Sequence, residues 1–135
     1  MKNRIKYLIF FTFFVSLCSS SCHRSELQLY IYVKNNSSKT AYYGLSYEYP
    51  DTSLIKIGFF PGQNGSIANK IKPGEQDFLA AWNFAYNPTM QLFIFDADVI
   101  EHEPKDSIVA HYMVLKRYQF TESDMEKVNW TITYP

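Results

Sequence analysis

The sequence predicts an all-β domain, an antiparallel β-sandwich, preceded by a cleavable N-terminal segment. Several runs alternate apolar and polar residues with a period of two, as expected where successive side chains of a strand point to opposite faces. Gly, Pro, Asn and Asp separate these runs roughly every 8 to 12 residues, which is typical of short strands joined by turns. Only one segment carries clear helix signals. We therefore expect about six to eight short strands and little helix.

The first strand is expected over 27–34, where the alternation is strongest. A polar turn follows at 35–39, because Asn tolerates left-handed backbone and Ser bonds its own main chain. Alternation resumes over 40–49, so the two runs predict a β-hairpin. One face of the first strand is expected to carry Leu27, Leu29, Ile31 and Val33, and the other face Tyr30 and Tyr32.

The middle of the chain gives weaker signals. An apolar stretch spans 54–60, and the Gly- and Asn-rich loop 63–74 is expected to contain a short strand near 66–71. The stretch 78–86 mixes Ala with aromatic residues and fits either a strand or a helix. A buried strand is expected over 90–95 because its side chains are almost all apolar.

The C-terminal part is expected to add two strands and one helix. A charged connection spans 101–107, with one helical turn after Pro104 as an option, and a strand is expected over 108–120. Thr121 to Asp124 resembles a capping box, which predicts a short helix over 122–128. The last strand is expected over 130–134, with Trp130, Ile132 and Tyr134 facing inward. The pattern of short strands leaves an immunoglobulin-like strand order as one option for a single domain over 27–135.

The N-terminus has the features of a secretory signal. A basic start is followed by the apolar run 7–17, which is too short to span a bilayer, and then by small residues up to Cys22. The segment resembles a lipoprotein signal, so we expect cleavage after 1–21, lipidation of Cys22, and a spacer that ends at Glu26 (22–26). Cys18 is the alternative acceptor, although Leu17 would then occupy a position that favours a small residue. A secreted protein with a free Cys22 is the other alternative.

Charge bears on possible partners. The chain has 13 basic and 13 acidic residues, and three of the basic ones lie in 1–21, which leaves 10 basic against 13 acidic residues. This balance argues against nucleic acid as a partner, because phosphates require a basic face. The sequence also lacks a polybasic patch for anionic lipid. Membrane attachment is therefore expected through acyl chains, each methylene contributing about 0.8 kcal/mol.

Candidate chemical sites are few. The sequence contains no Gly-rich phosphate loop, no HExxH and no GxSxG pattern, so we expect neither an enzyme nor a cofactor. Asp96 and Asp98 would share one face of a strand and form a candidate calcium site, but the sequence favours a solvated acidic loop. Asp106-Ser107-Ile108 resembles the acceptor pattern of Bacteroidetes O-glycosylation, which makes Ser107 a candidate.

Aromatic residues are the unusual feature of the composition, with 11 Tyr, 11 Phe and 2 Trp. Aromatic rings on a sheet present flat apolar surfaces on which sugar rings stack. The sequence favours the other interpretation, that they fill the core, because aromatic residues fit a pleated surface well. The candidate platform comprises Tyr30, Tyr32, Tyr42, Trp82 and Tyr86.

The C-terminal segment resembles the ending of small uncharacterised envelope lipoproteins of Bacteroidetes. The resemblance rests on 113–118, on Thr121 with 124–125, and on 129–135, with a second block at 49–54. It implies an outer-membrane lipoprotein, on the periplasmic or surface face, with a β-sandwich domain, and it carries no known activity. Three functions follow in order of preference: a non-enzymatic domain that binds a partner protein or serves a structural role, an accessory glycan-binding module, and a small hydrolase.

Overall fold

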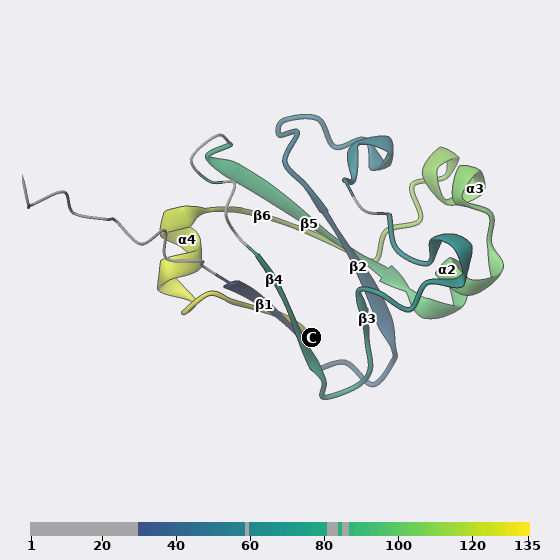
Figure 1. Cartoon of the computed structure of the whole chain (residues 1–135), viewed down its shortest axis with the longest axis horizontal. Helices are drawn as coiled ribbons and strands as arrows, with labels where there is room; N and C mark the ends of the chain where they lie inside the picture. Colours follow the sequence, from purple (N-terminus) through teal and green to yellow (C-terminus); the bar gives the residue numbers. More distant parts are fainter. Residues whose placement is uncertain (1–29, 59, 81–83, 85–86) are drawn as a thin grey trace, which may run out of the picture.

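The computed structural model describes residues 30–58, 60–80, 84 and 87–135, which form a mostly β fold with two sheets (Figure 1). The three-stranded sheet has the order β4-β1-β7 and the four-stranded sheet has the order β3-β2-β5-β6. The first sheet consists of β1 (Tyr30–Asn35), β4 (Gln76–Ala80) and β7 (Thr131–Tyr134); the second consists of β2 (Ala41–Ser46), β3 (Lys70–Ile71), β5 (Thr89–Asp96) and β6 (Lys116–Thr121).

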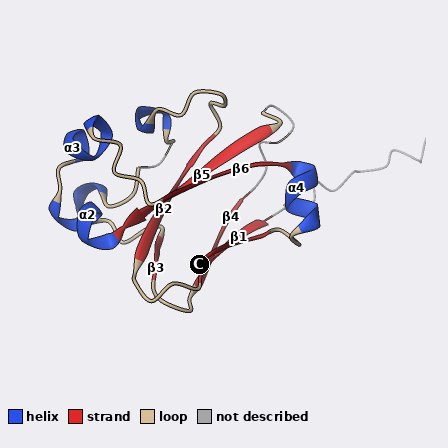
Figure 2. Cartoon of the chain, turned by 180° about the vertical axis from the view of Figure 1, so that it is seen from behind, coloured by secondary structure: helices blue, strands red, loops and turns tan. Residues whose placement is uncertain are grey.

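Helical segments are short and lie at the two ends of the fold (Figure 2). α2 (Ala97–His102) and α3 (Lys105–Ala110) lie together at one end, and α4 (Glu122–Lys127) lies at the other. Two 3-10 turns, η1 (Leu54–Lys56) and η2 (Gln63–Gly65), complete the described helical structure.

The helix predictions are partly confirmed. α4 begins as expected, with Thr121 and Asp124 forming a capping box. The strand expected over 108–120 is wrong in its first part, because α3 occupies Lys105–Ala110 and β6 begins only at Lys116. The apolar residues that suggested a strand there instead pack inward from α3, where Ile108 is buried.

The predicted hairpin between the first two strands is wrong. β1 pairs with β4 and β7, whereas β2 pairs with β3 and β5, so the turn after β1 carries the chain from one sheet to the other. Asn35 organises this crossing: its Nδ2 donates to the carbonyls of Lys39 (2.7 Å) and Ile71 (3.0 Å), and its Oδ1 accepts from Ser37 N and Oγ.

The sequence predicts purely antiparallel sheets, and this prediction is wrong for one strand pair. β1 and β7 run parallel, with Tyr32 opposite Thr131 and Val33 opposite Ile132. Parallel neighbours require a long connection. That condition is met here, because almost the whole described chain separates the two strands.

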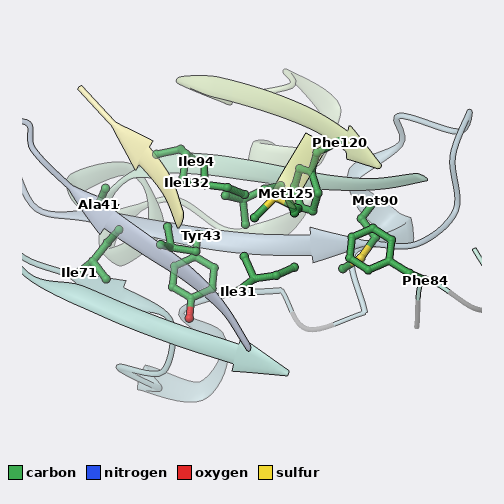
Figure 3. Packing of buried hydrophobic residues seen from close by; sticks show 12 residues of the cluster. Ile31, Ala41, Tyr43, Ile71, Phe84, Met90, Ile94, Phe120, Met125 and Ile132 are labelled. Atoms are coloured by element: carbon green, nitrogen blue, oxygen red, sulfur yellow. The ribbon is translucent and has the colours of Figure 1, made fainter. Parts of the chain in front are cut away.

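The main hydrophobic core lies between the sheets (Figure 3). It draws side chains from both sheets and from α4, including Met125, and Tyr43 is the largest of its fully buried side chains among the described residues. The Tyr43 hydroxyl donates to Asp77 Oδ2 at 2.8 Å and so ties β2 to β4 across the gap. The buried set consists of Ile31, Val33, Ala41, Tyr43, Ile71, Phe84, Met90, Leu92, Ile94, Phe120, Met125 and Ile132.

A second core covers the opposite face of the four-stranded sheet. Phe93 and Phe95 of β5 point to this side and are fully buried beneath α2, α3 and the 54–60 segment. β5 is therefore buried on both faces, which explains why its sequence is apolar without alternation. The buried set consists of Tyr42, Leu54, Ile57, Phe60, Phe93, Phe95, Ala97, Ile100 and Ile108.

Candidate ligand-binding face

The outer face of the three-stranded sheet carries exposed aromatic side chains. Along β1, Ile31 and Val33 are fully buried, whereas Tyr30 and Tyr32 are 38% and 36% exposed. The alternation that the sequence predicted for this strand is confirmed. Two of the five aromatic residues expected in a platform therefore share one exposed face.

Phe78 adds a third ring to this face. It is the cross-strand partner of Tyr32 on β4, and it is 59% exposed. Its ring centroid lies 5.4 Å from that of Tyr30, with the ring planes at 86°. We refer to Tyr30, Tyr32 and Phe78 as the aromatic face. Sequence reasoning missed Phe78 because it lies at the start of a stretch that fits a strand or a helix equally well.

Polar side chains border the aromatic face on the same side of the sheet. Lys34 follows Tyr32 by two residues on β1 and is paired with Gln76 of β4 and Thr133 of β7. Thr131 lies opposite Tyr32. Because Ile132 is buried in the core, the neighbouring threonines of β7 point outward. The face therefore combines aromatic rings with hydrogen-bonding groups.

Tyr42, the third expected platform residue, is buried. It lies in the second core, is 2% exposed, and its hydroxyl donates to Glu101 Oε1 at 3.1 Å. Lys70 pairs with the same carboxylate and lies over the Tyr42 ring, 5.5 Å from its centroid. Burial, together with the hydrogen bond to Glu101, raises the pKa of Tyr42. The hydrogen bond from Lys70, and to a smaller extent that from Tyr42, lowers the pKa of Glu101. Tyr42 thus joins β2 to α2, and its ring is not available for stacking.

Three further predicted residues, Trp82, Tyr86 and Cys22, lie outside the described residues. The expectations for them stay predictions. Ser107 lies in α3 and is half-buried, and its carbonyl accepts from the His111 ring at 3.0 Å. It therefore lies on the helix that begins after Pro104, where the sequence offered one helical turn as an option.

The geometry assumed for a calcium site does not hold. Asp96 ends β5, but Asp98 lies in the first turn of α2, so the two carboxylates do not alternate along one strand. Asp96 Oδ1 accepts from the Asp98 N–H at 2.9 Å and caps the helix. Within the described ranges, no group of three His, Cys, Asp or Glu side chains lies close enough to hold a metal ion.

Two shallow hollows lie elsewhere on the surface. One, of about 380 Å³, is bordered by η2, α2 and α3, and its charged lining residues are Glu103 and Lys105. The ammonium of Lys105 lies 5.1 Å from the centroid of the Phe60 ring. The other, of about 310 Å³, lies between β6, α4 and β7. Neither lining combines a nucleophile with a histidine base, so neither hollow supports a catalytic assignment.

The chain matches no family model, no curated protein and no solved structure. In the part of the chain that the structure describes, no helix is long and apolar enough to cross a membrane. The case for a function therefore depends on the sequence and on the geometry of this molecule.

Proposed function

We propose that this chain is a lipid-anchored protein of the bacterial envelope, without enzymatic activity, whose β domain binds a saccharide on the aromatic face. The single observation that carries the binding proposal is the exposure of Tyr30, Tyr32 and Phe78 side by side on one sheet. The proposed scaffold is a sandwich-like domain, and an immunoglobulin-like strand order stays a prediction.

Physical chemistry favours binding at this face. Exposed apolar side chains are normal when scattered, but a contiguous group of aromatic rings bordered by polar residues is typical of an interaction site. Aromatic rings stack on the apolar faces of sugar rings, and the adjacent Gln76, Thr131 and Thr133 have side chains able to bond hydroxyl groups. Because two of the three rings come from one strand of a paired sheet, the surface is formed before ligand arrives, which limits the entropic cost of binding.

A set of alanine variants tests the face. Tyr32→Ala and Phe78→Ala should each weaken binding in affinity electrophoresis through polysaccharide gels by at least about tenfold, the usual loss for truncation of a central aromatic contact. Tyr112→Ala is the matched control, because Tyr112 is also exposed (45%) but lies in the loop after α3. The proposal is refuted if the protein binds polysaccharides and the two face variants bind as tightly as the control.

A partner protein is the alternative ligand for the same face. Cross-linking of the protein in intact cells, with and without Phe78→Ala, separates the two cases. Cross-links to a protein that disappear with Phe78→Ala, together with no polysaccharide binding, would support the partner protein and reject the saccharide.

The anchor is tested separately. If Cys22 is the acceptor, cells labelled with a palmitate analogue should incorporate it into the unmodified protein and into Cys18→Ala, but not into Cys22→Ala. Labelling that persists in Cys22→Ala and disappears in Cys18→Ala would assign the other cysteine. No labelling of the unmodified protein would reject the anchor and favour a secreted protein.

A further inference from the structure

We propose that the saccharide bound at the aromatic face is acidic, and that Lys34 pairs with its carboxylate group. This inference rests on the proposed function, because it concerns the ligand of the same face. It is carried by the position of one lysine among otherwise uncharged neighbours.

Lys34 is placed on the aromatic face by the geometry of β1. It is two residues from Tyr32, so its Cα lies about 6.6 Å further along the strand on the same side of the sheet. The residues opposite it, Gln76 and Thr133, are uncharged. A sugar stacked on Tyr32 or Phe78 would therefore be within reach of a flexible ammonium group.

The local charge is unbalanced in favour of an anion. Lys34 has no ion-pair partner among the described residues, whereas nearby Lys72 is paired with Glu75 at 3.7 Å. Asp77 follows Gln76 but points into the gap between the sheets, where it accepts from Tyr43. The described side chains on the outer face of this sheet therefore include one cation and no carboxylate.

The net charge of the chain does not cancel this local effect. Without the expected signal segment 1–21, the chain has 10 basic and 13 acidic residues, which is a net charge of −3. Exposed charges separated by more than about 8 Å are largely screened at physiological ionic strength, so a bound carboxylate mainly senses the charges close to it, and Lys34 is the described cation on this face. Lysine acts as a point charge and does not demand one fixed orientation of its partner. A lysine can therefore pair with the carboxylate of a sugar ring that stacks in more than one position on the flat aromatic face.

An anionic membrane is the rival ligand for an aromatic surface with a lysine. One basic residue contributes only about 1 kcal/mol near such a membrane, and interfacial binding usually relies on clusters of basic residues. The hydroxyl and amide groups beside Lys34 are matched to sugar hydroxyls more than to acyl chains. The geometry therefore favours an acidic saccharide.

The test compares uronic-acid polymers with their own methyl esters, which keep the sugars and remove the charge. Oligomers of galacturonate, of alginate and of hyaluronan are each titrated, as acid and as ester, into the full-length protein in detergent. We expect at least one acid to bind about fivefold more tightly than its ester at low salt, the upper range for an exposed ion pair. Added salt should reduce the preference.

Variants assign the preference to one side chain. Lys34→Gln should bind acid and ester equally, whereas Lys56→Gln should keep the preference of the unmodified protein, because Lys56 lies in η1 on a different part of the surface. Urea unfolding of both variants checks that each is folded. Phe78→Ala should weaken binding of acid and ester alike.

Two results would overturn the inference and leave the proposed function standing: an ester that binds as tightly as its acid, or a preference for acid that survives in Lys34→Gln. If no acid or ester binds while neutral polysaccharides do, the inference also fails on its own. If no saccharide of any kind binds, the proposed function fails with it. Binding to phosphatidylglycerol vesicles that is lost in Lys34→Gln, without saccharide binding, would assign the face to a membrane.

Discussion

Replacement of Asn35 by Ala tests how the chain crosses between the two sheets. The side chain is fully buried at the end of β1 and uses both ends of its amide. It bonds the start of β2 through Lys39, the edge strand β3 through Ile71, and its own turn through Ser37. No other described residue connects these three segments through a single side chain.

The expected cost of Asn35→Ala follows from what each partner loses. The Ile71 carbonyl is left without its buried donor, which costs about 1–3 kcal/mol. The Lys39 carbonyl keeps its bond from Ser37 Oγ at 2.9 Å, so its loss is smaller, and Ser37 N loses an acceptor. We expect the free energy of unfolding to fall by about 2–5 kcal/mol in total, because each of the two weaker losses adds about 0.5–1 kcal/mol.

Urea unfolding followed by tryptophan fluorescence measures this change, and the transition midpoint should fall with little change in slope. Asn36→Ala is the matched control, because Asn36 is exposed and its described bond uses the backbone N–H.

A further variant, Asn35→Asp, keeps the shape of the side chain but replaces the Nδ2 donor by a carboxylate oxygen, which faces the Lys39 and Ile71 carbonyls. Its folded-state pKa should be raised by burial, so the variant should be least stable at neutral pH and recover as the pH falls. The reasoning is refuted if Asn35→Ala costs no more than Asn36→Ala.

Two further predictions concern other parts of the fold. Gly62→Ala should lower the free energy of unfolding in urea by about 2–4 kcal/mol, because Gly62 has a φ of 73° and a Cβ there would lie 2.2 Å from Ile100 Cγ2. Gly65→Ala is the control: Gly65 has a similar φ but open space around it, so this change should cost only about 1 kcal/mol. Equal costs would contradict the role of the contact. Hydrogen bonds from the Thr121 backbone N–H and, to a smaller extent, from its hydroxyl lower the pKa of Asp124 to about 2. The stabilisation by this cap is therefore complete above about pH 3.8 and is lost as the pH falls through about 2. NMR titration of the carboxyl group should give that midpoint, and Thr121→Ala should move it upward; a midpoint near 3.8 in the unmodified protein would reject the cap.

Local signals predicted the parts of the fold that depend on neighbouring residues. The alternation in β1 placed Ile31 and Val33 on one face and Tyr30 and Tyr32 on the other, because pleating alone determines which side each residue occupies. In the structure the first pair is buried and the second pair is exposed. The capping box before α4 was also found, since its bonds join residues only three positions apart. These features need no knowledge of distant contacts.

Strand partners could not be predicted in the same way. An Asn- and Ser-rich turn between two alternating runs is typical of a hairpin. Here the amide of Asn35 instead bonds the Ile71 carbonyl, 36 residues away, and this contact leaves no local trace in the sequence. The parallel pairing of β1 with β7 has the same character, because it joins the two ends of the described chain.

The aromatic residues show how a second core misleads pattern analysis. Alternation placed Tyr42 and Tyr43 on opposite sides of the strand, with Tyr42 as a candidate for the platform, and it does lie on the opposite side of β2. That side is covered by α2 and the 54–60 segment, so both tyrosines are 2% exposed. Phe78, by contrast, lies on an edge strand with one covered side. The fate of each ring thus depends on which sheet it joins, and the sequence did not indicate that assignment.

The layering of the fold explains why the candidate site lies where it does. The four-stranded sheet is covered on one side by the other sheet and on the other by α2, α3 and the 54–60 segment, as the two cores show. The outer side of β4-β1-β7 is the sheet face that the described chain leaves open. β1 also begins only eight residues after Cys22, and an extended chain of that length spans at most about 28 Å. If Cys22 is lipidated, Tyr30 must lie within that distance of the anchor, so a saccharide ligand would be bound close to the membrane surface. Loss of the anchor in Cys22→Ala should then leave binding to purified saccharide unchanged while releasing the bound complex from the envelope.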